Sequence, residues 1–108
     1  MENFTALCTY RVKEGKDEEF RTLLLNHWPT LQQLGLVTDE APQMFRGKDE
    51  SGKSFFVELL HWKTSDSPNV AEQMPEVLAI WERMGKLVET RLGRPAMEFP
   101  HVERIKKA

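Results

Sequence analysis

Residues 55–64 read FFVELLHWKT, the most apolar stretch of the chain, and their pattern decides the fold. In a β-strand, successive side chains point to opposite faces of the sheet. One face of this strand then carries Phe56, Glu58, Leu60 and Trp62, and the other carries Phe55, Val57, Leu59 and His61. Each face holds a polar group among hydrophobic ones, which indicates either a buried structural hydrogen bond or the lining of a pocket.

The composition is that of one soluble domain covering residues 1–108, with 40% hydrophobic and 30% charged residues. The 17 acidic and 15 basic residues are interleaved and give a net charge of −2, so we expect no nucleic-acid partner. Cys8 is the single cysteine and excludes an intrachain disulfide, which favours a cytoplasmic location. We expect no signal peptide and no membrane span, because no apolar run is long enough.

Periodicity on either side of this strand predicts the remaining elements. Alternation indicates strands over 3–12, 43–48, 54–63 and 96–105, with a turn at 49–52, and helical spacing indicates helices over 17–34, 69–73 and 75–92. Asp17 is expected to cap the first long helix, and Pro100 implies an edge or a bulge in the last strand. The order predicts an α+β fold, the ferredoxin-like β-α-β-β-α-β arrangement, with a four-stranded antiparallel sheet and two helices on one face.

The helices present apolar stripes, and the sheet has a second face that they cannot cover. The stripe of the first long helix is Phe20, Leu23, Leu24, His27, Leu31 and Leu34, and that of the second is Val77, Trp81, Met84, Val88 and Leu92. The opposite sheet face contains apolar residues such as Leu7 and one of the two rows of residues 55–62. A second copy laying its sheet against the first would cover them, so a homodimer is expected.

Several kinds of site find no support in the sequence. The three histidines, His27, His61 and His101, lack the close spacing of a metal motif, and we expect no metal. Cys8 on an apolar strand face is read as a small buried hydrophobic residue rather than a nucleophile. No glycine-rich phosphate loop follows a strand, so no nucleotide or other cofactor is expected.

An aromatic and polar cluster remains as the candidate site. Its predicted substrate-binding residues are Tyr10, Trp62, Trp81, Met84 and Phe99, and Trp28 is a further aromatic residue nearby. Glu58 is the sharpest signal, because a carboxylate flanked by Phe56, Leu60 and Trp62 is costly to bury unpaired. Either a basic partner satisfies it, or it lies in a wet cavity with its pKa raised.

The segments VKEGKDEEF, FFVELLHWKT, MPEVLAIWERM and FPHVERI together resemble the antibiotic-biosynthesis-monooxygenase-like group of dimeric α/β-barrel proteins. The resemblance covers most of the chain. It implies a pocket between the sheet and the helices of each subunit, with the sheets of two subunits facing each other. The third-strand aromatic residue of that group looks into the pocket, and Trp62 matches it. The resemblance thereby places the row of Glu58 and Trp62 under the helices and the row of His61 toward the dimer.

Members of that group include cofactor-free oxygenases acting on polycyclic phenols and quinols, and haem-degrading enzymes. The haem-degrading members use an Asn on the first strand and a His shortly after the Trp. Cys8 and the region of Glu72 hold neither residue, which argues against haem degradation.

Two functions are consistent with these residues. The first is a cofactor-independent monooxygenase or related enzyme acting on a small aromatic, quinol- or phenol-type substrate, with Glu58 or His101 as the base that removes the phenolic proton. The second is a non-catalytic dimeric module that binds a small molecule or serves assembly, in which the polar residues satisfy one another. A thermal-shift screen discriminates between them, because a ligand that binds the native state raises the melting temperature, and no hit from aromatic, haem and lipid panels would favour the second function.

Overall fold

The structure is a computed structural model that describes residues 4–105. Its elements in chain order are β1 (Thr5–Arg11), α1 (Asp17–Gln33), β2 (Gln43–Lys48), β3 (Ser54–His61), α2 (Ser67–Ala71), α3 (Pro75–Leu87), β4 (Met97–Glu98) and β5 (His101–Val102). Asn3, the first residue of the predicted first strand, lies outside the described residues. Within residues 4–105, no helix has both the length and the apolar character needed to cross a membrane.

The strands form one antiparallel sheet in the order β2-β3-β1-β4, with β5 also paired to β1. This order confirms the ferredoxin-like α+β prediction. The predicted last strand is divided into β4 and β5, which are separated by Phe99 and Pro100. Pro100 has no N–H to give to the ladder, but its carbonyl oxygen accepts a hydrogen bond from Leu7 N–H at 2.8 Å. Pro100 therefore lies at an edge of the sheet, one of the two outcomes expected for it, and the edge pairs with β1 on both sides of the proline.

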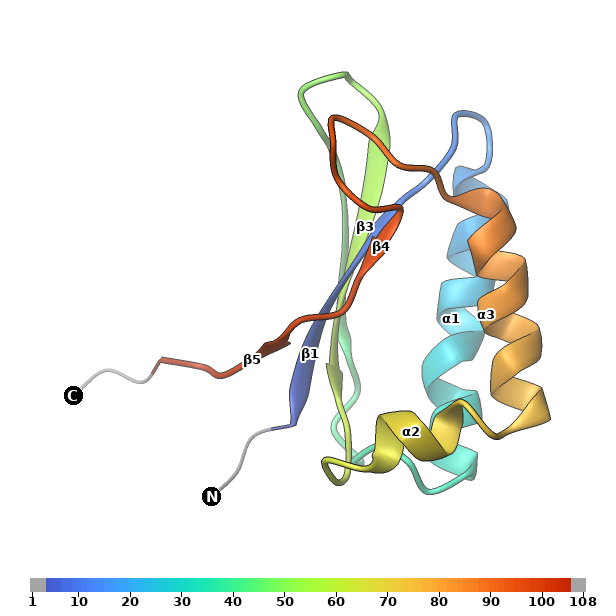
Figure 1. The fold of residues 1–108 in the computed structure, drawn as a ribbon, viewed down its shortest axis with the longest axis vertical. Coiled ribbons are helices and arrows are strands. Elements are labelled where there is room, and N and C mark those ends of the chain that lie inside the picture. Colours follow the sequence, from blue (N-terminus) through green and yellow to red (C-terminus); the bar gives the residue numbers. More distant parts are fainter. Residues whose placement is uncertain (1–3, 106–108) are drawn as a thin grey trace.

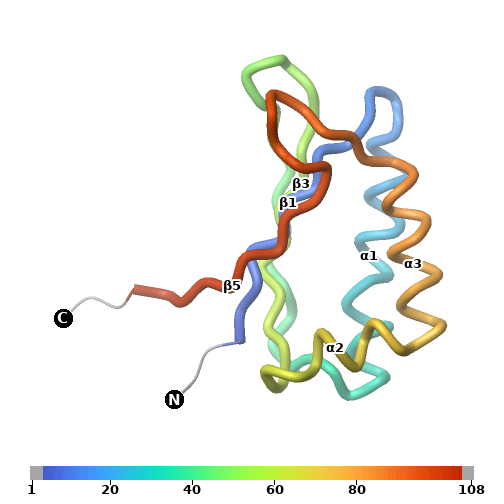
Figure 2. The backbone as a smooth tube through the Cα atoms, in the orientation of Figure 1, coloured from blue at the N-terminus to red at the C-terminus, as the bar shows by residue number. Residues whose placement is uncertain are grey.

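The helices form a second layer on one face of the sheet. Figure 1 shows α1 and α3 side by side along this face, with the short α2 across one end of the space between the layers. The tube in Figure 2 follows the chain from α3 back over the sheet edge to β4 and β5, away from the helix layer. The two layers and the α2 end together enclose the space in which the candidate site lies.

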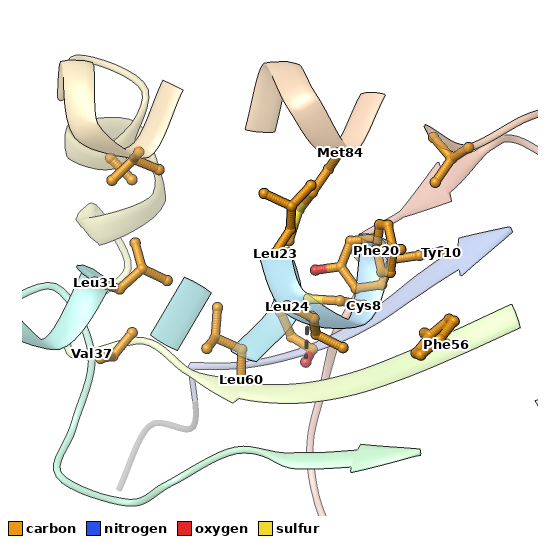
Figure 3. Close-up of a cluster of buried hydrophobic side chains, with 14 of the residues drawn as sticks. Cys8, Tyr10, Phe20, Leu23, Leu24, Leu31, Val37, Phe56, Leu60 and Met84 are labelled. Atoms are coloured by element: carbon orange, nitrogen blue, oxygen red, sulfur yellow. Dashed lines mark hydrogen bonds between the residues drawn. The ribbon is translucent and has the colours of Figure 1, made fainter. Parts of the chain in front are cut away.

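The pairing register puts the predicted row of β3 under the helices. Glu58 pairs with Cys8 and Leu60 pairs with Ala6, and all four side chains are buried. In Figure 3, Leu23 and Leu24 from α1 and Met84 from α3 meet side chains of β1 and β3 between the layers. The side chains of the opposite row of β3 are only partly buried, so alternation and resemblance predicted the register correctly.

The sheet face away from the helices is apolar and open. It carries Leu7 on β1 and Phe55, Val57 and Leu59 on β3, all partly buried, and Phe45 on β2, which is 57% exposed. Figure 1 shows α1, α2 and α3 all on the opposite face of the sheet.

The second long helix is shorter than predicted. It ends at Leu87, where Val88 becomes extended and forms a bridge with Val12 of the first strand region. Lys13 N–H donates to the Leu87 carbonyl oxygen at 2.8 Å, which takes an acceptor that a longer helix would use internally. Leu92, predicted as the last residue of the apolar stripe, is instead 58% exposed with a φ of 55°. The prediction of a helix to residue 92 is wrong because bonds to the sheet compete with it.

Asp17 also differs from its predicted role. It is the first residue of α1, preceded by Lys16 as the cap residue, and no side chain caps this helix end. The Asp17 carboxylate instead accepts a hydrogen bond from the Ser54 hydroxyl at 2.6 Å. Its charge still favours the positive end of the helix dipole, while the hydrogen bond ties the start of α1 to the start of β3.

Arg91 fastens the loop after α3 to the sheet. Only 7% exposed, it donates to Asp49 at 2.8 Å, to Glu89 at 3.1 Å and to the Val12 carbonyl oxygen at 2.6 Å. Hydrogen bonds from Ser51 and then from Arg91 hold the pKa of Asp49 well below its ordinary value. The arginine therefore joins the β2–β3 turn, the end of β1 and the segment before β4.

Candidate active site

A cavity of about 390 Å³ lies between the sheet and the helix layer. It falls in the size range of about 300–1,000 Å³ in which proteins bind small molecules. Every layer of the molecule contributes to its lining, which consists of Ala6, Cys8, Tyr10, His27, Leu60, Trp62, Pro68, Glu72, Trp81, Met84, Met97, Phe99 and His101.

The cavity has a buried floor and an exposed mouth. Cys8, Tyr10, His27, Leu60 and Met84 are all buried, and they come from β1, α1, β3 and α3. The exposed lining residues are Glu72, Phe99 and His101. The entrance therefore lies between the end of α2 and the β4–β5 segment, and a ligand would pass two ionisable side chains before it reached an apolar interior.

A chain of three hydrogen bonds runs along the inner wall. The Trp81 indole N–H donates to His27 Nε2 at 2.9 Å, and His27 Nδ1 lies 3.0 Å from Glu58 Oε1 and 3.3 Å from Glu58 Oε2. The Tyr10 hydroxyl donates to Glu58 Oε1 at 2.9 Å. The four side chains come from α3, α1, β3 and β1, so the chain connects both helices to the two central strands.

The donor and acceptor types in this series of hydrogen bonds determine which atoms carry the protons. An indole nitrogen can only donate, so His27 Nε2 must carry a lone pair. A neutral His27 then has its proton on Nδ1 and donates to Glu58. The carboxylate accepts from both His27 and Tyr10, which is the arrangement expected for an ionised group. The chain thus consists of one buried carboxylate held by neutral donors.

Among residues 4–105, the buried charge of Glu58 has no ion pair with a lysine or arginine. Glu58 is 0% exposed, and the ion-pair partner that the described residues provide for it is His27. No lysine or arginine lines the cavity within residues 4–105. A buried charge is costly unless it is paired, and one additional proton on His27 would turn the chain into a neutral imidazolium–carboxylate pair. The buried Glu58 carboxylate therefore depends on His27 and Tyr10 for the hydrogen bonds that compensate its burial.

Two further groups on the floor remain protonated near neutral pH. Burial, followed by the nearby charge of Glu58 and by Cys8, raises the pKa of Tyr10 well above its ordinary value. Burial and then the charge of Glu58 raise the pKa of the Cys8 thiol to about 12, against a smaller lowering by its hydrogen bond with Tyr10. Neither side chain can act as an anionic nucleophile here, which is consistent with the reading of Cys8 as a buried hydrophobic residue.

Solved structures with the same arrangement of elements support a common fold. A protein provisionally named as an antibiotic biosynthesis monooxygenase, from Bordetella bronchiseptica, aligns with a TM-score of 0.71 and 11% identity over 94% of this chain and 96% of its own. A variant of SnoaB, a cofactor-independent oxygenase from Streptomyces nogalater, aligns with a TM-score of 0.66 and 13% identity over 95% and 93% of the two chains. A third, with the same provisional name and from Caulobacter crescentus, gives a TM-score of 0.62 and 19% identity over 94% of each chain.

The chain has the antibiotic-biosynthesis-monooxygenase-like fold. The resemblance noted in the sequence is thereby confirmed at the level of the fold. No protein-family model matches the chain, and no curated protein matches its sequence.

Within this monooxygenase-like fold, the structure brings together the residues predicted to bind a substrate. Tyr10, Trp62, Trp81, Met84 and Phe99 all line the cavity. Tyr10 and Met84 belong to the floor. Phe99 is 52% exposed at the mouth, and its ring lies edge-to-face with that of Tyr10, with centroids 5.9 Å apart and planes at 69°. Their roles toward a ligand remain predictions.

The two predicted bases are placed differently. Glu58 does not line the cavity, because Tyr10 and His27 lie between its carboxylate and the open space. Of the alternatives left open by the sequence, the structure thus shows protein partners for Glu58 rather than a wet pocket around it. His101 lines the mouth and is exposed. Contact of either residue with a substrate stays a prediction.

His27 is the functional candidate that sequence reasoning did not select. It occupies an apolar stripe of α1 between Leu24 and Leu31, where a lone histidine reads as part of the core. The available signal was a second buried polar residue, Glu58, whose charge needed a partner. Nothing in the spacing of the two residues, 31 positions apart, shows that they meet.

His61 lies outside the candidate site. His61 Nδ1 lies 2.9 Å from the Thr5 hydroxyl and its Nε2 lies 3.3 Å from Glu40, on the side of the sheet away from the cavity. Among residues 4–105, no group of three or more His, Cys, Asp or Glu side chains could hold a metal ion.

Proposed function

We propose that the protein is a cofactor-independent oxygenase that binds a small, electron-rich aromatic molecule in the cavity and removes its acidic proton. The observation that carries this proposal is the Glu58–His27 pair, a buried base whose acceptor nitrogen lies in the cavity wall. Support for the reaction class comes from SnoaB, named a cofactor-independent oxygenase, which shares the fold at 13% identity.

His27 is the proton acceptor in this proposal. A phenol or the enol form of an anthrone gives its O–H proton to Nε2, and the imidazolium formed is stabilised by Glu58 through the Nδ1–H bond. Glu58 acts through His27 as a positioning residue that fixes the tautomer. The previously uncompensated carboxylate then becomes half of an ion pair, so proton transfer removes part of the cost of burying it.

The substrate anion supplies the electrons for the reaction with oxygen. For an anthrone, the CH₂ carbon combines with O₂ and becomes a carbonyl, and the second oxygen atom leaves as water with the two hydrogens of that carbon. Trp62, Trp81 and Phe99 would hold the flat ring system, because stacking and edge contacts with aromatic rings favour such a ligand. The protein's task is to hold and deprotonate the substrate in a site with little water.

Oxygen uptake by the pure protein with anthrone and quinol substrates tests this proposal. We expect the wild type to consume oxygen and His27→Gln to lose activity by about 10²–10⁴-fold, the usual contribution of a general base. His101→Gln is the matched control, because it changes the other histidine of the cavity lining and tests the competing prediction that His101 is the base. Full activity in His27→Gln with loss in His101→Gln would reverse the two roles.

A ligand-binding module without catalysis is the second candidate. It is favoured by the observation that every member of the hydrogen-bonded chain already has a protein partner. A thermal-shift panel of aromatic compounds combined with the absence of oxygen uptake separates the two functions, since binding alone raises the melting temperature.

We also propose that the protein works as a homodimer in which the open sheet faces cover each other. The support is the row of apolar side chains around Val57 and the 57% exposure of Phe45, since surfaces of this kind mark interaction sites. Sedimentation at micromolar concentration should show a dimer, and Phe45→Arg should shift it toward monomer. Leu78→Arg, at a 44% exposed position on α3, is the control and should leave the dimer intact.

A further inference from the structure

The proton acceptor of the site is covered in the free protein. His27 Nε2 is the only ring nitrogen of His27 that is not directed at Glu58, and the indole N–H of Trp81 occupies it at 2.9 Å. The two rings are tilted by 57° with their centroids 6.3 Å apart, so the contact is an edge-on hydrogen bond rather than a stack. A substrate that gives its proton to His27 must first take the place of Trp81.

The surroundings of Trp81 allow such a replacement. Its side chain is only partly buried, whereas Met84, one turn further along α3, is 1% exposed. Both residues line the cavity. Moving an indole that already touches solvent gives up less core packing than moving the fully buried Met84 would. Trp81 is thus the member of the hydrogen-bonded chain that can leave it at low cost.

The three other members cannot be replaced in this way. Tyr10 and His27 are buried to 1% and 2% exposure, and both donate to a carboxylate that would be left unpaired in the interior. Glu58 is behind them and out of reach of the cavity. The bond between Trp81 and His27 joins two neutral groups, which makes it the weakest link of the chain.

We propose that the indole N–H of Trp81 is a displaceable donor, and that the hydroxyl group of an aromatic ligand replaces it on His27 Nε2. In the empty site Trp81 keeps His27 in the Nδ1–H tautomer, with the Nε2 lone pair accepting from the indole N–H. In the occupied site the ligand O–H makes that bond instead. Trp81 is a positioning and specificity-determining residue, because a ligand hydroxyl must compete with its N–H for His27 Nε2, whereas a ligand without a hydroxyl leaves the Trp81–His27 bond in place.

This inference rests on the proposed site but not on oxidation. It concerns binding alone and holds for a ligand that never reacts with oxygen. The competing polar groups are Glu72 and His101 at the mouth, which are exposed and can hydrogen-bond to water. A ligand hydroxyl gains most where water is excluded, so the buried lone pair of His27 is its preferred partner.

Binding of β-naphthol and of its methyl ether tests the inference, because the two compounds share a ring system and differ in the hydroxyl donor. Affinities are measured for the wild type and for Trp81→Phe, which keeps an aromatic ring and loses the N–H. We expect Trp81→Phe to raise the ratio of naphthol affinity to ether affinity by about 2- to 10-fold, since one neutral hydrogen bond no longer competes. Trp62→Phe, the same substitution at a cavity residue not bonded to His27, should leave the ratio unchanged.

A second measurement uses the wild-type protein. The indole ¹H–¹⁵N resonance of Trp81, assigned by its loss in Trp81→Phe, should shift on addition of β-naphthol and stay in place with the ether. An unchanged affinity ratio in Trp81→Phe, a Trp81 resonance that ignores bound naphthol, or failure of naphthol to bind either protein overturns the inference. Naphthol binding with the expected ratio but no oxygen uptake with quinols or anthrones would refute the proposed oxygenase and leave the role of Trp81 intact.

Discussion

The substitution Tyr10→Phe removes a single atom from the buried hydrogen-bonded chain. The phenol oxygen donates to Glu58 Oε1 at 2.9 Å, and the ring packs against Phe20 with centroids 5.0 Å apart. Phenylalanine keeps this ring packing. The change therefore isolates one donor to a carboxylate that is 0% exposed and leaves His27 as its remaining partner.

The cost follows from the charge of the acceptor. A hydrogen bond to a charged group contributes about 1.5–3 kcal/mol. The free energy of unfolding of Tyr10→Phe should fall by that amount. For a chain of this length, 1 kcal/mol corresponds to roughly 4 °C, so the melting temperature should fall by about 6–12 °C.

Urea and thermal unfolding followed by circular dichroism measure both quantities. Trp81→Phe is the matched control, because it removes a donor from the other end of the same chain, where the acceptor is a neutral imidazole. Its cost should be smaller, about 0.5–1.5 kcal/mol. The reasoning is refuted if Tyr10→Phe costs less than Trp81→Phe, since the carboxylate would then not depend on its second donor.

Other perturbations probe the titrating groups and the cavity wall. The folded protein raises the pKa of Cys8 from an ordinary 9.0 to about 12. The contribution of this thiol to stability is therefore complete below pH 9 and is lost as the pH rises toward 12. In urea titrations between pH 8.5 and about 10.5, Cys8→Ala should lose less stability than the wild type. Because the pKa of Asp49 is lowered, its contribution to stability has the opposite pH dependence: it is present above the ordinary value of 3.8 and is lost as the pH falls below that value. Asp49→Asn, which gives up the charge paired with Arg91, should flatten this part of an acid unfolding curve. Leu60→Ala should lower the free energy of unfolding by about 2–5 kcal/mol, because the side chain is 0% exposed, whereas Leu78→Ala at 44% exposure should stay within about 0.5 kcal/mol of the wild type.

The local sequence pattern predicted which face of β3 is buried and where α3 begins. Alternation in FFVELLHWKT fixed which row of β3 faces the helices, since a shift of one residue would expose the whole apolar row. The start of α3 at Pro75 was also predicted, because proline suits a first helical turn. The apolar stripe that ends at Leu92 predicted a helix to residue 92, but the bridge between Val88 and Val12, far apart in sequence, ends it earlier.

The site was predictable as a set of residue types and not as a network. The aromatic residues of the cavity were predicted because large apolar side chains at strand and helix spacing must lie between the layers. The carboxylate of Glu58 in an apolar strand row predicted that it has a polar partner. The identity of that partner depends on how α1 packs across the sheet, and His27 in an apolar stripe resembles any satisfied core histidine. Tertiary packing determines such pairings, and local sequence does not predict which residues it brings together.

The hydrogen bonds that link Trp81, His27, Glu58 and Tyr10 also constrain the position of the helix layer relative to the sheet. Its three hydrogen bonds, between 2.9 and 3.0 Å at their shortest, link α3 to α1 and α1 to the central strands in series. Hydrogen bonds require donor–acceptor distances of about 2.7–3.2 Å and near-linear geometry, so a shift of the helix layer against the sheet would weaken this series. Repacking of the distant core beneath α1 would therefore change the chemistry of the cavity wall, and selection for activity would act on core residues that never meet a ligand.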